Sequence, residues 1–80
     1  MKKIYIIYLC NDYQGFAFTF EGAYHYVRNK LMEDKHYRNS LKELDEIYDN
    51  YVKTGEYQNF YSGDWQIEEG EQVETEGDIK

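Results

Sequence analysis

Cysteine and proline are scarce in this sequence. The 80 residues include no proline and one cysteine, Cys10, which excludes a disulfide within the chain. Domains of this size often need disulfides or a structural metal, yet no histidine and cysteine residues have the spacing of a zinc site. The core must therefore come from side-chain packing. A lone thiol without a signal-peptide pattern favours a reducing, cytoplasmic setting.

Positive charge and long apolar runs are also in short supply. The chain contains nine lysine and arginine residues and 16 aspartate and glutamate residues, which gives a formal net charge of −7. This balance disfavours direct binding to nucleic-acid phosphates or to an anionic membrane surface. The longest apolar run, residues 4–10, is too short to cross a bilayer. The charge instead favours a basic protein partner, because complementary potentials steer encounter.

Aromatic residues are abundant, with ten tyrosines, four phenylalanines and one tryptophan. Each buried aromatic side chain removes roughly 150–250 Å² of surface from water. A single domain of this size can build its core from them.

The N-terminal segment, residues 3–9, is β-branched and aromatic throughout, which predicts a strand. Both of its faces are apolar, so we expect a central strand that is covered at least partly on both sides. Residues 11–15 supply turn chemistry, and residues 16–18 form either a short second strand or only the lead into the first helix. In the predicted strand of residues 3–9, Ile4, Ile6 and Tyr8 form one face, and Tyr5, Ile7 and Leu9 form the other.

Two amphipathic helices are expected next. Thr19 is suited to cap the first, and the second covers residues 34–52, starting at Asp34 or Ser40 and ending before Gly55. Apolar residues recur at intervals of three or four in both segments, which places them on one stripe of each helix. The stripes are Phe20, Ala23, Tyr24, Val27 and Leu31 in the first helix, and Tyr37, Leu41, Leu44, Tyr48 and Tyr51 in the second.

The C-terminal region predicts a β-hairpin followed by a tail. Residues 57–61 and 65–69 flank a two-residue Gly63-Asp64 loop, a register that pairs Phe60 with Ile67. From Gly70 onward, acidic residues alternate with small or polar ones, which favours an acidic flexible tail over residues 70–80.

These elements predict a single α+β domain over residues 1–69. The helices would pack on one face of a three- or four-stranded, mainly antiparallel sheet. Two helices do not easily cover both faces, so we expect an open face rich in tyrosine, suited to a partner or to a second copy. Its candidate residues are Tyr5, Ile7, Leu9, Tyr57 and Tyr61.

Catalytic and metal-binding patterns are weak. Glu21 and His25 are four residues apart on a helix, a spacing that often arises by chance, and Cys10 and His36 have no evident catalytic partners. The glycines are dispersed and form no phosphate-binding loop. We therefore expect neither enzymatic activity nor a metal or other cofactor.

The second helix also carries an acidic cluster: Glu43, Asp45, Glu46 and Asp49. Carboxylates in a row along a helix have a spacing of the same order as phosphates along a nucleic-acid strand, and such a row fits a basic groove built for DNA or RNA. A charged, solvated outer face is the simpler interpretation of the same residues. Further acids in residues 68–78 favour a basic partner.

Three segments resemble small, acidic accessory proteins of bacteriophages that infect low-GC hosts: KKIYIIYLCND, FAFTFEGAYHYV and the strand WQIEE. Such phage proteins include anti-CRISPR and other anti-defence inhibitors, several of which are acidic and occupy the nucleic-acid site of a nuclease. The resemblance implies activity in the cytoplasm of a bacterial host, and it assigns no role to any individual residue.

The resulting expectation is a non-enzymatic inhibitor that binds a basic nucleic-acid-handling protein, for example an RNA-guided nuclease. Carboxylates Glu43, Asp45, Glu46 and Asp49 would make the electrostatic contacts, and exposed tyrosines would provide the anchors. The alternatives are a sponge that captures a nucleotide signal between tyrosines, and a structural phage protein that dimerises.

Overall fold

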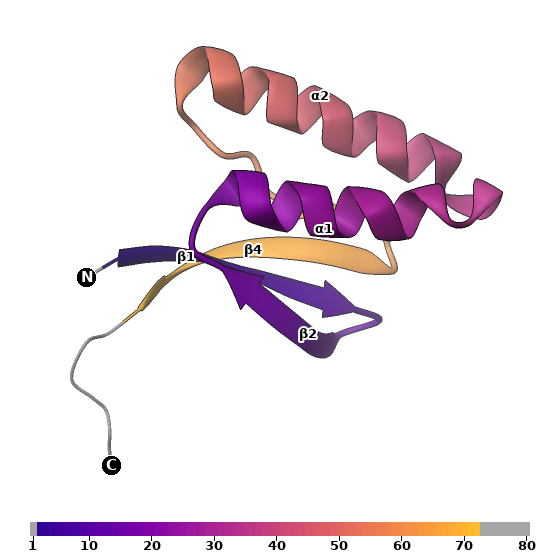
Figure 1. The fold of residues 1–80 in the computed structure, drawn as a ribbon, viewed down its shortest axis with the longest axis horizontal. Coiled ribbons are helices and arrows are strands. Elements are labelled where there is room, and N and C mark those ends of the chain that lie inside the picture. Colours follow the sequence, from indigo (N-terminus) through magenta and orange to yellow (C-terminus); the bar gives the residue numbers. More distant parts are fainter. Residues whose placement is uncertain (1, 73–80) are drawn as a thin grey trace.

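The computed structural model describes residues 2–72. Its sheet has the strand order β2-β1-β4-β3, and all neighbouring strands are antiparallel. Both helices lie on the same side of this sheet (Figure 1), which confirms the predicted α+β architecture. The elements are β1 (Lys2–Leu9), β2 (Asp12–Ala17), α1 (Phe20–Met32), the short 3-10 helix η1 (Lys35–Tyr37), α2 (Arg38–Thr54), β3 (Phe60–Tyr61) and β4 (Trp65–Gln72).

Strand β1 is central, as predicted, and lies between β2 and β4. It pairs with β4 along its whole length. Tyr5 and Ile7 are buried beneath the helices, whereas Ile4, Ile6 and Tyr8 alternate with them and are only half-buried on the opposite face. The two faces of β1 were predicted correctly, but the helices cover the face that was expected to be open.

Local capping residues set the helix boundaries. Thr19 Oγ1 accepts a hydrogen bond from the backbone N–H of Gly22 at 3.1 Å, which confirms Thr19 as the N-cap of α1. Asp34 accepts from the backbone N–H of His36 at 2.9 Å and opens η1. Helix α2 therefore begins at Arg38, later than Asp34 and earlier than Ser40. Gly55 ends α2 with a φ of 79°, as predicted.

The C-terminal hairpin has the predicted register, with Phe60 paired to Ile67. Strand β3 is only two residues long, because the side-chain hydroxyl of Tyr57, and not a further backbone pair, makes the hydrogen bonds at its N-terminal end. That hydroxyl accepts from the Phe60 N–H at 2.9 Å and donates to the Ile67 carbonyl.

Strand β4 continues through Gly70 to Gln72, past the point where the tail was predicted to begin. Gly70 pairs with Ile4, and a Cβ at Gly70 would lie 3.4 Å from Cδ1 of Ile6. A glycine at this position lets the isoleucine side chains lie across the sheet. The predicted acidic tail otherwise falls on residues 73–80, outside the described residues.

The core is a cluster of aromatic rings around Phe20, which is completely buried. Its ring centroid lies between 4.5 and 6.3 Å from those of five tyrosines, in tilted or edge-on arrangements that aromatic pairs favour. These tyrosines are Tyr5, Tyr24, Tyr48, Tyr51 and Tyr57.

Buried tyrosines predict a loss of stability in alkali. Burial, aided by the nearby Tyr51 and Glu69, raises the pKa of Tyr5 from 10.0 to about 12. Burial also raises the pKa of Tyr57. A raised folded-state pKa gives stability that is complete below the unfolded pKa and is lost as pH rises through the folded pKa. We expect urea unfolding to show falling stability from pH 10 to pH 12.

The matched variant for this test is Tyr5→Phe, which has no hydroxyl to ionise. Its free energy of unfolding should fall less steeply over the same pH range. An identical fall in both proteins would contradict the role of Tyr5.

Candidate partner-binding site

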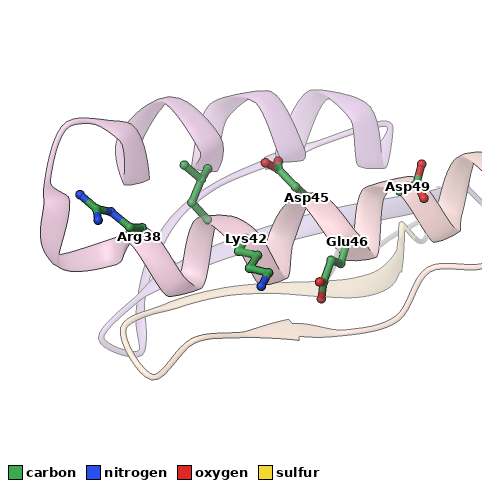
Figure 2. A pocket seen from close by; sticks show the side chains of 6 residues that line it. Arg38, Lys42, Asp45, Glu46 and Asp49 are labelled. Carbon is green, nitrogen blue, oxygen red and sulfur yellow. The ribbon is translucent and has the colours of Figure 1, made fainter.

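The predicted acidic cluster lies on α2, but its members do not form one continuous row. Figure 2 shows Asp45 and Asp49 directed to one side of α2, Asp45 toward the neighbouring helix, and Lys42 and Glu46 directed to the other side. These residues, Arg38 and Leu41 line a shallow depression of about 440 Å³. Glu43 is not part of it, because 3.6 residues per turn place Glu43 about 120° around the helix from Asp49.

Asp45 links the two helices. Its Oδ1 accepts hydrogen bonds from the Tyr24 hydroxyl at 2.8 Å and from Nε of Arg28 at 3.1 Å. Burial and the bond to Asp45 raise the pKa of Tyr24, and the same carboxylate raises the pKa of Arg28. Asp45 thus has cationic and hydroxyl partners within the chain, so it is not an unpaired charge for a partner.

The other carboxylates differ in their surroundings. Asp49 forms an exposed ion pair with Lys53 at 3.1 Å, and no ion pair among residues 2–72 involves Glu43 or Glu46. Helix α2 carries four acids and three cations, which leaves it a net charge of −1. Helix α2 is therefore of mixed charge and not uniformly acidic.

Two aspartates of α2 give a test of these assignments. We expect Asp45→Ala to lower the free energy of unfolding by roughly 1 kcal/mol, since hydrogen bonds to a charged group are lost but the site is partly open to water. Asp49→Ala removes a solvent-exposed pair and should change stability by less than ~0.5 kcal/mol. Urea denaturation measures both, and equal effects would contradict the bridging role of Asp45.

Of the three tyrosines predicted as anchors, only Tyr61 is exposed, at 60%. Tyr5 is 5% exposed, and its hydroxyl donates to Glu69 at 3.3 Å. Tyr57 packs against the core. The expectation that Tyr5 and Tyr57 lie on an open face is wrong, because α1 and α2 cover them and their rings surround Phe20.

The uncovered side of the sheet carries a different apolar surface. The strand register brings Tyr13, Tyr8, Gln66 and Tyr61 into one row across all four strands. A second row contains Phe16, Ile6 and Glu68. We call this surface the open sheet face, and its apolar residues are Ile4, Ile6, Tyr8, Tyr13, Phe16, Phe18 and Tyr61.

Strand β2 and Phe18, the residue that follows it, account for much of this exposed surface. Phe16 and Phe18 are 47% and 63% exposed, and their rings pack edge-on with centroids 5.3 Å apart. Gly15 and Ala17 alternate with them and lie on the helix-covered side, opposite Ile7 and Tyr5. The alternation of small and aromatic residues in residues 15–18 is the sequence signal that identifies the open side.

The two candidate surfaces lie on opposite sides of the molecule. The helices occupy one face of the sheet (Figure 1), so the acids of α2 lie on the helix side and the open sheet face lies on the other. A flat partner surface therefore reaches the open sheet face or the α2 acids, but not both.

The described residues offer little chemistry of other kinds. Among them, no group of three or more metal-ligating side chains comes together, and no helix is long and apolar enough to span a membrane. Glu21 and His25 form an exposed pair at 3.7 Å. Tyr24 and Tyr48 stack with centroids 3.9 Å apart, which leaves no space for a base between them.

Comparisons with protein-family models, with curated proteins and with solved structures give no match to this chain. Its function therefore has to be inferred from these surfaces.

Proposed function

We propose that this chain is a non-enzymatic inhibitor that docks through its open sheet face onto a basic, nucleic-acid-handling protein. The observation that carries the proposal is the open sheet face itself. Contiguous exposed apolar surface on a small domain marks an interaction site more often than solitary apolar residues do. Three tyrosines and two phenylalanines supply rigid contact area of the kind that is enriched at the centre of interfaces.

Charge favours a basic partner over a second copy of the chain. Two copies each carrying a net charge of −7 repel one another. Pairing two open sheet faces would also desolvate Glu68 in each copy. A lysine or arginine of a different protein would instead compensate Glu68 within the contact.

Nucleic-acid-handling proteins offer basic surfaces of this kind. RNA-guided nucleases hold their heteroduplex in a positively charged channel. Docking of an acidic domain beside or inside such a channel blocks access of the nucleic acid by volume and by charge. In this mechanism the open sheet face provides the anchor, and the net charge speeds encounter.

Contact through the α2 carboxylates is the second candidate, because Glu43 and Glu46 have no ion-pair partner within residues 2–72. Asp45 does not belong to this candidate contact, since Arg28 and Tyr24 engage it.

A pull-down tests the proposal. The tagged chain is incubated with nuclease-treated bacterial lysate containing an RNA-guided nuclease, at low and at high salt. We expect the nuclease to be captured and its DNA cleavage to be inhibited, with weaker capture at high salt. The triple variant Glu43→Lys, Glu46→Lys, Asp49→Lys should slow association and still bind. Loss of all capture in that variant would indicate that the partner contacts α2 and not the open sheet face. Absence of capture by the unaltered chain would contradict the proposed class of partner.

A further inference from the structure

The apolar residues of the open sheet face are concentrated on two neighbouring strands. Strand β1 and the segment from β2 to Phe18 form an apolar band two strands wide. Strand β4 runs along one side of this band and presents polar residues to the same face. We call this surface the β1–β2 band, and its residues are Ile4, Ile6, Tyr8, Tyr13, Phe16 and Phe18. The residues that border it on β4 are Gln66, Glu68 and Gly70.

Strand β1 has the composition of a strand that lies between two layers. Strands covered on both faces read as continuous apolar runs, whereas strands with one solvated face alternate with polar residues. Helix α1 provides one layer, since it packs on β1 and β2 from the other side of the sheet, where Tyr5 meets Phe20. Within residues 2–72, no helix lies on the open side (Figure 1). The second layer that the composition of β1 indicates is therefore not supplied by this part of the chain.

The dimensions of the β1–β2 band match those of an α-helix. Two neighbouring strands occupy ~10 Å of a sheet, and an α-helix with its side chains is ~10–12 Å wide. Residues on one face of a strand repeat every ~6.7 Å, close to the ~6 Å rise of four helical residues. Ile4, Ile6 and Tyr8 therefore match positions i, i+4 and i+8 of a helix that lies along the strand.

We propose that an amphipathic helix of the basic partner lies along the β1–β2 band and places a lysine or arginine against Glu68. The inference rests on the proposed function and names the element of the partner that binds. Glu68 is exposed beside Ile6, and no ion pair among residues 2–72 involves it. A cation on the flank of the helix that faces β4 reaches this carboxylate while the apolar stripe covers Ile6.

Two other occupants fit the band less well. Residues 73–80 of this chain have the sequence VETEGDIK, with three acids and one lysine, and would bring further carboxylates to Glu68. A second copy of the chain offers no suitable helix within its described residues, because the buried stripes of α1 and α2 both pack into its own core. A basic helix from a different protein complements both the apolar band and the acid.

A phage-display selection against the full chain tests the proposal. One library presents random residues on one face of a fixed helical scaffold, and a second presents random extended peptides. We expect enrichment from the helical library, with apolar residues at i, i+4 and i+8 and with lysine or arginine on one flank. The selected helical peptide is then added to protein labelled at its isoleucine methyl groups. The NMR signals of Ile4 and Ile6 should shift, whereas that of Ile7, which is buried on the helix side of the sheet, should not.

Matched variants of the chain sharpen the result. Glu68→Lys should weaken binding of the basic helical peptide at least about tenfold, because it places two cations against each other. Glu71→Lys makes the same change of charge on the same strand, but on the helix-covered side, and should leave affinity within about twofold. Phe16→Ala removes an aromatic contact from the band and should weaken binding about tenfold. Tyr61→Ala removes an exposed ring beyond β4 and should weaken binding less than about threefold.

Enrichment of extended peptides alone, or of helices with acidic flanks, would overturn the proposal of a basic helix. A shift of the Ile7 methyl signal with no change at Ile4 and Ile6 would also overturn it. The pull-down separates this inference from the proposed function. Capture of the nuclease without enrichment of any helical peptide would overturn the helix and keep the proposed function, whereas a basic helical binder without capture would contradict only the proposed class of partner.

Discussion

Replacing Ile6 with glutamate is expected to abolish capture of the partner while the domain stays folded. Ile6 lies at the middle of the open sheet face, with Phe16 on one neighbouring strand and Glu68 on the other. Docking would desolvate the new carboxylate beside Glu68, and a partner cation that compensates Glu68 would not neutralise a second carboxylate as well. Disruption of a central anchor costs ~2 kcal/mol or more, so affinity should fall at least about 30-fold.

Val52→Glu is the matched control for this variant. Val52 is an exposed apolar residue of α2, on the other side of the molecule. It should leave capture unchanged. The melting temperatures of both variants establish that the fold is intact. Normal capture by the Ile6→Glu protein, with a normal melting temperature, would contradict binding of the partner to the open sheet face.

Replacing Phe20 with alanine is expected to have the largest effect on stability. Phe20 is completely buried and contacts rings from β1, α1, α2 and the segment before β3. Truncation of a buried phenylalanine costs about 3–5 kcal/mol, through lost transfer energy and the cavity left behind. Small domains have only ~5–15 kcal/mol of stability in total. Urea denaturation should therefore show a variant close to unfolding.

The control for Phe20→Ala is two residues away. Phe18 is 63% exposed and contacts Phe16 on the open side of the sheet. Phe18→Ala should change the free energy of unfolding by less than ~1 kcal/mol, since little buried surface is lost. Similar losses from both substitutions would contradict the assignment of Phe20 to the centre of the core.

Local chemistry made much of the fold predictable. Thr19, Gly55 and the Gly63-Asp64 loop each specify a cap or a turn through residues close in sequence, and all three were confirmed. Strand β4 extends farther than predicted because its last residues pair with Lys3 and Ile4. That pairing joins the first and the last strand of the sheet, and the glutamates and the glycine in residues 68–71 give no local sign of it.

The choice of covered face was not predicted because both faces of β1 are apolar. Periodicity alone assigns Tyr5 and Ile6 to opposite faces without ranking them. Packing decides the outcome: Tyr5 meets Phe20 of α1, and Ile6 is left on the other side. Gly15 and Ala17 in β2 carry the missing information, because only small side chains fit beneath a closely packed helix.

The charge that the acidic cluster offers to a partner was also not predictable from the sequence alone. Helical spacing correctly placed Asp45, Glu46 and Asp49 on α2. It did not reveal that Arg28, on the other helix and 17 residues earlier, binds Asp45. Pairing between elements depends on how the helices pack, so charge counted along one helix overestimates the charge available to a partner.

The central claim is that a partner covers the open sheet face, and hydroxyl-radical footprinting tests it most directly. Exposed side chains are oxidised in the free chain and in the complex recovered from the pull-down, and mass spectrometry compares the rates. We predict protection of Tyr13, Phe16, Phe18 and Tyr61 and unchanged oxidation of Met32 and Val52, all of which are exposed in the free chain. Protection of Val52 with unchanged oxidation of Phe16 and Phe18 would contradict the account and place the partner on the helices.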